Sequence, residues 1–297
     1  MAEAESLWSA IAAVINAQRD RPSLIQQAQP VGGGCINRSY RLVLEDGQAW
    51  FVKLNQRDSL AAFAAEAEAL TAIAASQTIR VPTPIAWGEA DRTAYLVLEW
   101  LDIDRGASDW QQLGADLAQL HRQTHSAQGF GWHRDNVIGQ TPQINPWQWD
   151  WGRFWQVQRI QFQLDLAARN GYRWPHAQAL CDRIPDLLAD HQPKPALVHG
   201  DLWSGNASFL ADGTPVIFDP ATYYGDREVD LAMTELFGGF PPAFYEGYRQ
   251  VWPLDPGYRS RRDLYNLYHV LNHVNLFGGG YVHQAQRLID RLLATSR

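Results

Sequence analysis

The chain has 297 residues, of which 46% are hydrophobic and 19% are charged, and its net charge is −7. This length suits one large domain or two modest ones, and the composition excludes a disordered chain. The negative charge, without any run of Lys or Arg, disfavours a nucleic-acid partner, because binding to a phosphate backbone needs a basic face.

The sequence also argues against a membrane protein and against a disulfide-rich one. No stretch approaches the ~18 consecutive apolar residues of a membrane helix, and the first residues lack the pattern of a signal peptide. Cys35 and Cys181 are the only cysteines, too few for a disulfide framework in a chain of this length. We therefore expect a cytoplasmic protein with no membrane partner.

The first hundred residues are predicted to form a small sheet with two helices. Apolar residues at helical spacing predict helices over residues 5–20 and 60–76. The turn Glu45-Asp46-Gly47 predicts a hairpin. Five β-like runs lie at residues 24–31, 38–44, 48–54, 85–87 and 94–99.

Three consecutive glycines, Gly32, Gly33 and Gly34, separate the first two predicted strands. Glycines let a backbone approach phosphate groups closely and point its N–H groups at them. Their place inside a small sheet favours a phosphate-binding loop. Cys35 follows directly, and two interpretations of it stay open: a small packing residue, or an exposed thiol that is redox-active or links two chains.

A lysine and a glutamate are predicted to pair between the third strand and the second helix. By period 2, Lys53 lies on the face opposite Trp50 and Val52. Helical phase at about 100° per residue puts Glu66 on the apolar face of its helix, whereas Glu68 points the other way. Because a buried carboxylate is costly unless it is paired, we expect Glu66 to pair with Lys53 and Glu68 to be a surface charge.

After residue 100 the pattern changes from strands to helices. A polar stretch with a glycine, Arg105-Gly106-Ala107-Ser108, follows the fifth strand. We therefore expect a β-rich lobe over residues 1–100 and a mainly helical lobe over residues 101–297. A loop is predicted at residues 129–147. One helix of the second lobe is predicted to lead into His121. Further helices are predicted near residues 149–169, 178–188, 229–236, 242–248, 261–276 and 284–293.

A short apolar run, Ala196-Leu197-Val198, leads into a His-Gly-Asp turn that ends at Asp201. Asn206 follows five residues later, and Asp219 ends the next apolar run. Phosphoryl transfer needs a carboxylate that accepts the proton of the attacking hydroxyl, which suits Asp201. It also needs oxygen ligands for Mg²⁺, which suits Asn206 and Asp219. The alternative is a β-hairpin whose Asp, Asn and Gly residues only form turns.

The order of these motifs along the chain resembles that of the protein-kinase-like superfamily. The resemblance implies an α+β, bilobal fold with a small β-rich N-terminal lobe and a larger helical C-terminal lobe. Finer stretches resemble the fructosamine kinase (ketosamine-3-kinase) family across nearly the whole chain. They are His199–Asn206, Val216–Ala221, Gly32–Ile36, Phe51–Lys53, Phe237–Phe240 and Leu271–His273.

This second resemblance implies ATP- and Mg²⁺-dependent phosphorylation of the C3 hydroxyl of ketosamines such as fructoselysine or a ribulosamine. The product is unstable and sheds its sugar, so that glycated amines or protein lysines are deglycated. The resemblance implies that Asp201 is the catalytic base and that Asn206 and Asp219 bind the metal. It also implies that Lys53 contacts the nucleotide phosphates and that Glu66 orients it.

The resemblance also implies where adenine binds and which regulatory motifs the chain lacks. Glu99 and Leu101 occupy the hinge positions whose backbone holds adenine. Asp219-Pro220-Ala221 stands where a protein kinase has Asp-Phe-Gly, and no activation-loop signature is present, so protein-kinase activity is not expected.

Several alternatives stay open at this stage. Trp203, just after the base, is either a wall of the sugar pocket or a core residue. The acceptor could instead be an aminoglycoside or choline, or the chain could be an inactive nucleotide-binding scaffold. The intact Lys53, Asp201, Asn206 and Asp219 argue against the inactive form. Both a monomer and a redox-linked dimer are compatible with the sequence.

Overall fold

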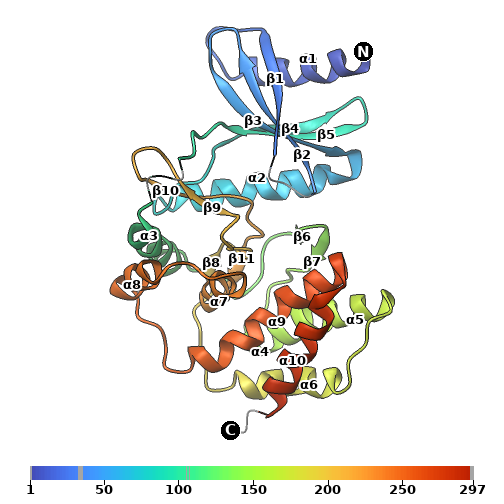
Figure 1. Cartoon of the computed structure of the whole chain (residues 1–297), viewed down its shortest axis with the longest axis vertical. Helices are drawn as coiled ribbons and strands as arrows, with labels where there is room; N and C mark the ends of the chain where they lie inside the picture. The colour runs from blue at the N-terminus through green and yellow to red at the C-terminus, as the bar shows by residue number, and fades with distance from the viewer. Residues whose placement is uncertain (1, 33–35, 105, 107, 295–297) are drawn as a thin grey trace. The chain divides into compact units, whose positions relative to one another are not determined.

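The computed structural model describes residues 2–32, 36–104, 106 and 108–294, and the ribbon in Figure 1 follows the whole chain. Contacts divide the chain into two compact units. The first unit consists of Met1–Ser108 and Ser208–Phe218, and the second of Asp109–Ala207 and Asp219–Arg297.

The first unit extends beyond the expected boundary at residue 100. Its second segment contains the strands β9 (Ala207–Phe209) and β10 (Pro215–Ile217), which pair with each other. The Asp104 N–H donates to the Phe209 carbonyl at 2.9 Å, and the Ile217 N–H donates to the Arg80 carbonyl at 3.0 Å. These backbone bonds join residues more than a hundred positions apart, which no local sequence pattern reports.

A five-stranded antiparallel sheet forms the centre of the first unit, in the order β1-β2-β3-β5-β4. Each strand lies within two or three residues of its predicted position. The strands are β1 (Ile25–Val31), β2 (Arg38–Leu44), β3 (Ala49–Gln56), β4 (Pro84–Ala90) and β5 (Thr93–Glu99).

Alternation along β3 divides its side chains between the two faces of the sheet. Val52 and Leu54 belong to a buried cluster with Ile11 and Ile15 of the helix α1 (Ala2–Asn16). Lys53 therefore points to the other face, where α2 (Leu60–Ala75) supplies its partner. The apolar pattern of one strand thus fixes which helix the lysine meets.

The second unit is mainly helical and holds two short two-stranded sheets. Its strands are β6 (Asn136–Ile138), β7 (Thr141–Gln143), β8 (Ala196–Val198) and β11 (Tyr223–Gly225). Its helices are α3 (Trp110–Gln123), α4 (Trp151–Phe154), α5 (Phe162–Arg169), α6 (Ala177–Leu187), α7 (Glu228–Leu236), α8 (Pro242–Val251), α9 (Tyr258–Phe277) and α10 (Gly280–Ala294).

Two sequence expectations for the second unit need correction. The stretch 129–147 is not a loop throughout, because β6 and β7 form a hairpin inside it. The helix expected over residues 149–169 is interrupted by a π-helical segment, Trp155–Gln161. Strands of three residues are too short for a period-2 pattern, and a π-helical bulge leaves the helical hydrophobic spacing nearly unchanged.

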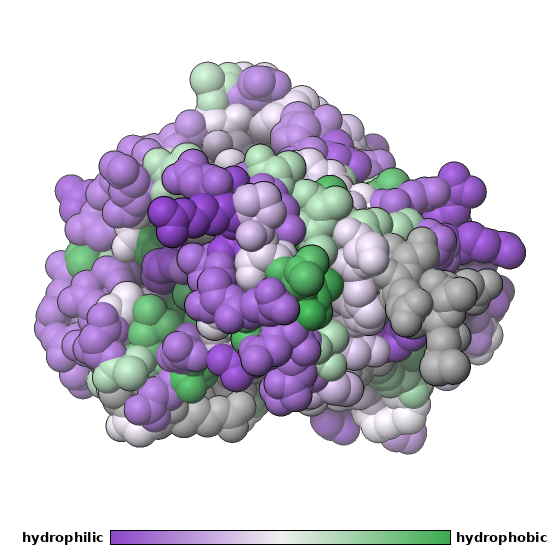
Figure 2. Space-filling model, turned by 90° about the horizontal axis from the view of Figure 1, so that it is seen from above, coloured by the Kyte–Doolittle hydropathy of each residue, from purple (hydrophilic) through white to green (hydrophobic). Residues whose placement is uncertain are grey.

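The surface carries no broad apolar area on the face that Figure 2 shows. Among the residues that carry a colour there, hydrophilic ones predominate and hydrophobic ones form only small separate patches. In the part of the chain that the structure describes, no helix is long and apolar enough to cross a membrane.

Candidate active site

The turn that follows β8 is held in a shape that requires glycine. Gly200 has a positive φ of 83°, and a Cβ atom there would lie 2.1 Å from the Ala221 carbonyl oxygen. The His199 carbonyl accepts a hydrogen bond of 2.9 Å from the Ala221 N–H. Any side chain at position 200 would push apart the two segments that carry Asp201 and Asp219.

Asn206 is tied to the same turn. Its Nδ2 atom donates to the Asp201 carbonyl oxygen at 2.9 Å and lies 3.5 Å from Asp201 Oδ2. The amide nitrogen is thus used within the turn, and the Oδ1 oxygen is left as the group that can bind a cation. Asn206 is 5% exposed, so this orientation is fixed by packing as well as by the hydrogen bond.

Negative charge is concentrated around Asp201. Burial, together with the charges of Asp219 and Asp230, raises the pKa of Asp201 to about 7, against a smaller opposing effect of the hydrogen bond from Asn206. Asp219 itself adopts a positive φ of 59°, a conformation in which Asp is several-fold enriched. Carboxylates whose charges repel one another in this way favour the binding of a proton or a cation.

A buried hydrogen-bond network around Asp230 supports the turn that carries Asp201. Asp230, on α7, accepts hydrogen bonds from the backbone N–H groups of His199 at 2.7 Å and Gly200 at 2.8 Å. Its Oδ2 atom lies 3.0 Å from Nε2 of His121, whose Nδ1 lies 2.9 Å from the Tyr248 hydroxyl. These contacts fix the backbone next to Asp201.

Sequence analysis did not identify Asp230 as a functional residue. One signal was present: Asp230 is a single carboxylate inside the apolar stretch Val229-Asp230-Leu231-Ala232-Met233 of a predicted helix. A charge at such a place needs a buried partner. Its partners, however, are backbone groups thirty residues away and a histidine of α3, which the sequence alone does not specify.

In the first unit, the expected pair of Lys53 and Glu66 is present. Lys53 Nζ lies 2.7 Å from Glu66 Oε1, and their side chains are 5% and 14% exposed. The helix phase used to choose between the two glutamates was therefore correct for Glu66. Glu68, expected to be a surface charge, is instead half-buried.

The remaining nucleotide-site candidates also lie in the first unit. Gly32 follows the end of β1, whereas Gly33, Gly34 and Cys35 lie outside the described residues. Glu99 ends β5, and Leu101 follows it without regular structure.

The surroundings of Glu99 show which of its groups are already in use. Its carboxylate accepts hydrogen bonds from the Arg80 guanidinium and, at 3.1 Å, from the Thr83 N–H. Its own N–H donates to the Thr83 carbonyl at 2.8 Å. The carbonyl of Glu99 is therefore the group through which this residue could contact a ligand.

Trp203 is the candidate for the acceptor pocket and belongs to the second unit. It is 40% exposed, and its ring covers Gly205 so closely that a Cβ atom there would lie 2.3 Å from the indole. The ring therefore lies against Gly205, in the turn between Asp201 and Asn206. This exposure excludes the alternative of a core residue.

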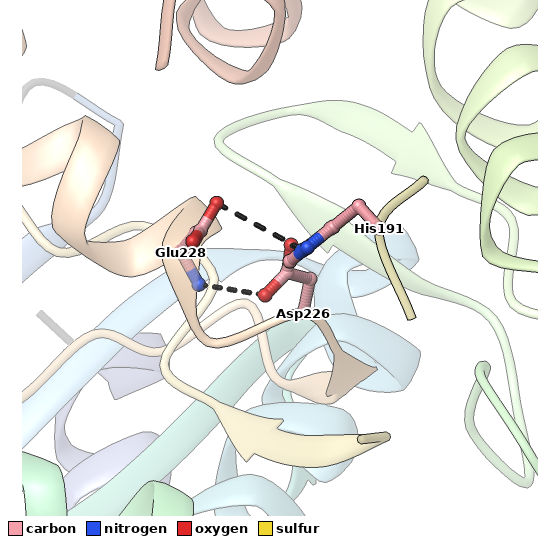
Figure 3. A group of neighbouring side chains, drawn as sticks. All are labelled: His191, Asp226 and Glu228. Carbon is pink, nitrogen blue, oxygen red and sulfur yellow. Dashed lines mark hydrogen bonds and ion pairs between the residues drawn. The ribbon is translucent and has the colours of Figure 1, made fainter. Parts of the chain in front are cut away.

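A second cluster of titratable groups lies at the start of α7, as Figure 3 shows. His191 Nε2 lies 2.6 Å from Asp226 Oδ2 and 3.9 Å from Glu228 Oε2. These three side chains have the types and spacing of metal ligands. Arg261, however, donates to both oxygens of Glu228 at 2.7 Å, and the Tyr265 hydroxyl donates to Asp226 at 2.5 Å. The cluster is thus a charge network that already contains its own cation.

Comparison with known proteins identifies the family. The sequence matches the fructosamine kinase family over residues 7–295. It is 54% identical to a probable ketoamine kinase of Synechocystis over 288 residues, covering 96% of this chain and 97% of that protein. It is 41% identical to a chloroplastic protein-ribulosamine 3-kinase of Oryza sativa subsp. indica, covering 89% of this chain and 78% of that protein.

A solved structure agrees with these matches. The crystal structure of a candidate fructosamine-3-kinase from Haemophilus somnus 129PT superimposes with a TM-score of 0.92 at 31% identity, covering 99% of this chain and all of that one. The α+β, protein-kinase-like fold predicted from the sequence is confirmed. The chain belongs to the fructosamine kinase family.

Proposed function

We propose that this protein is an ATP- and Mg²⁺-dependent kinase that phosphorylates the C3 hydroxyl of ketosamines. The observation that carries the proposal is that Asn206 is hydrogen-bonded to Asp201 and that the charge of Asp219 acts on Asp201, in a chain of the fructosamine kinase family. The similarity to a ketoamine kinase and a protein-ribulosamine 3-kinase supports a sugar joined to an amine as the acceptor.

The residues around Asp201 fit a magnesium ion. Asn206 offers an amide oxygen, because its nitrogen is used within the turn, and Asp219 offers a carboxylate. Both are hard oxygen ligands of the kind that Mg²⁺ prefers. Burial, followed by repulsion from the charges of Asp219 and Asp230, raises the pKa of Asp201, and a bound cation would relieve this repulsion. When bound, the ion would neutralise charge on the phosphates of ATP.

Asp201 is the proposed general base. It accepts the proton of the acceptor hydroxyl while the hydroxyl oxygen attacks the γ-phosphorus of ATP. Trp203, half-exposed beside the base, is proposed as a flat wall against the sugar. The support of the turn by Asp230 keeps the base in place without direct contact with the substrate.

The first unit is proposed to bind the nucleotide. Lys53, kept in position by Glu66, would contact phosphate oxygens, and the glycine loop that begins at Gly32 would contact them through backbone N–H groups. The carbonyl of Glu99 and the backbone of Leu101 would hold adenine. We accordingly assign nucleotide binding to the N-terminal lobe and acceptor binding to the C-terminal lobe, in the cytoplasm.

An acceptor panel tests the proposed function. Fructoselysine, a ribulosamine, a glycated protein, an aminoglycoside and choline are each offered with ATP and Mg²⁺, and ADP formation is measured. We expect turnover with the ketosamines alone. Turnover with only the aminoglycoside or only choline would show that the acceptor is not a ketosamine and would identify the acceptor class instead. ADP formation with none of them would favour the inactive scaffold.

A further inference from the structure

His269, on α9, has a buried ring nitrogen without a partner beside the proposed base. Its side chain is 2% exposed, and its Nδ1 atom makes no hydrogen bond with any described residue. That atom lies 4.0 Å from Oδ1 of Asp201, too far for a direct hydrogen bond. A buried polar atom left unpaired is costly and needs an explanation such as a functional role.

The electrostatic surroundings keep this imidazole neutral. Burial lowers the pKa of His269 to about 3, helped by the neighbouring His273 and Arg159 and opposed by Asp230. A neutral ring carries one N–H, and the carboxylate of Asp201 on the Nδ1 side favours the tautomer with hydrogen on Nδ1. His269 then presents a donor toward the base without adding a charge.

The distance between the two atoms suits a single oxygen atom placed between them. An oxygen that makes hydrogen bonds of about 2.8 Å to both atoms can bridge them, because 4.0 Å is less than twice that length. Such an oxygen would accept from His269 and donate to Asp201. A hydroxyl group has the one donor and the acceptor capacity that this position requires.

We propose that His269 is an acceptor-contacting residue, whose Nδ1–H donates to the hydroxyl oxygen that gives its proton to Asp201. This inference rests on the proposed function of Asp201 as base. In the reaction the oxygen–phosphorus bond forms, the bond between the γ-phosphorus and the β,γ-bridging oxygen breaks, and ADP leaves. The hydroxyl proton passes to Asp201, and His269 keeps its own hydrogen. The histidine thus aims a lone pair of the attacking oxygen.

Two amide substitutions test the inference with matched chemistry. In His269→Asn the side-chain amide branches from Cγ, as Nδ1 does, so a donor stays near the same position. In His269→Gln the amide lies one bond further out, near the position of Nε2. We measure kcat and KM for the acceptor, KM for ATP, and the thermal midpoint of each variant.

We expect His269→Asn to keep most of the acceptor kcat/KM and His269→Gln to lower it by about tenfold or more, the scale of one lost hydrogen bond. The KM for ATP should stay unchanged in both. Similar thermal midpoints would show that folding does not explain the difference. Equal acceptor kcat/KM in the two variants, whether high or low, would overturn the inference, and so would a rise in the KM for ATP that matches the loss.

Should His269→Gln fail to fold, ¹⁵N NMR of the wild-type protein with ADP and Mg²⁺ gives the answer. We expect the Nδ1 signal of His269 to shift on addition of acceptor, and an unchanged signal would overturn the inference. The test of His269 can be distinguished from the test of the proposed function, because it uses whichever acceptor the panel shows to be phosphorylated. If the panel shows turnover with another acceptor and none with ketosamines, the acceptor class changes, and the His269 variants are then measured with that other acceptor.

Discussion

Asp230 holds the backbone of His199, through a hydrogen bond of 2.7 Å from the His199 N–H to its Oδ2 atom. The same carboxylate accepts from the Gly200 N–H at 2.8 Å. The negative charge and both hydrogen bonds are fully buried. The position of Asp201 is therefore determined by a side chain of the helix α7 as well as by the turn itself.

Replacing Asp230 with Asn should damage both stability and turnover. The Asn side chain presents one acceptor oxygen where the carboxylate presents two, so at least one backbone N–H loses its partner. We expect the free energy of unfolding to fall by about 1–3 kcal/mol, the cost of an unsatisfied buried group. We also expect kcat to fall, because the backbone next to Asp201 is held less firmly. The exposed Asp212, which accepts from the Thr214 N–H at 2.9 Å, is the control. Equal effects of Asp212→Asn and Asp230→Asn would contradict this account.

Replacing Asp201 with Asn should separate catalysis from binding. The amide has nearly the same shape but cannot take the hydroxyl proton, so turnover should fall by about 10²-fold or more, the scale of general-base catalysis. ATP affinity should remain, because the proposed nucleotide contacts lie in the first unit. Steady-state kinetics and nucleotide titration measure the two quantities. Near-normal turnover in this variant would remove Asp201 from the role of base.

The pair of Lys53 and Glu66 should be coupled in both stability and function. Removal of one partner breaks the ion pair of a buried charge, which commonly costs about 3–5 kcal/mol. Lys53→Met should also raise the KM for ATP, whereas Glu66→Gln should mainly lower kcat, because Lys53 is no longer held in position.

A double-mutant cycle on these two residues measures the coupling. The control is a cycle on Arg57 and Glu89, which form an ion pair of 2.8 Å but are 67% and 36% exposed. Exposed pairs typically contribute about 0–1 kcal/mol. A coupling energy for Lys53 and Glu66 no larger than that of the control would show that the buried pair is not a unit.

His191 should make stability depend on pH above neutrality. Burial lowers the pKa of His191, but the hydrogen bond to Asp226 and the charges of Asp226 and Glu228 raise it by more, above its ordinary value near 6.5. Because the folded protein binds this proton more tightly than the unfolded chain does, the histidine stabilises the fold fully below about pH 6.5. This contribution is lost as the pH rises through the folded-state pKa.

Thermal midpoints between pH 6 and pH 9 test this dependence. The other charged groups around His191 are Asp255, at 3.7 Å from Nδ1, and Arg261, which is bound to Glu228. The wild-type midpoint should fall across this range, and the fall should be smaller in His191→Gln, which cannot titrate. A parallel fall in both proteins would assign the pH dependence to other groups.

The sequence predicts those parts of this protein that depend on local periodicity and short motifs. Period 2 along β3 and helical phase along α2 were enough to place Lys53 opposite Glu66. The His-Gly-Asp turn and the spacing to Asn206 likewise identified one connected turn.

Other features depend on contacts between distant segments, which local patterns do not encode. Asp230 acts on backbone groups of another segment, and His269 stands out only because its Nδ1 has no partner among the described residues of the folded protein. The hairpin β9–β10 joins the first unit through bonds to Arg80 and Asp104. The half-buried state of Glu68 likewise was not predicted by the helical phase of α2.

The most direct test of the central claim is the identity of the phosphorylated product. Fructoselysine is incubated with the protein, ATP and Mg²⁺, and the products are followed by ³¹P NMR and mass spectrometry. The account predicts a new phosphate ester on the C3 oxygen of the sugar, followed by its decay with release of free lysine. A phosphate ester on another hydroxyl, or a stable ester that releases no lysine, would contradict it.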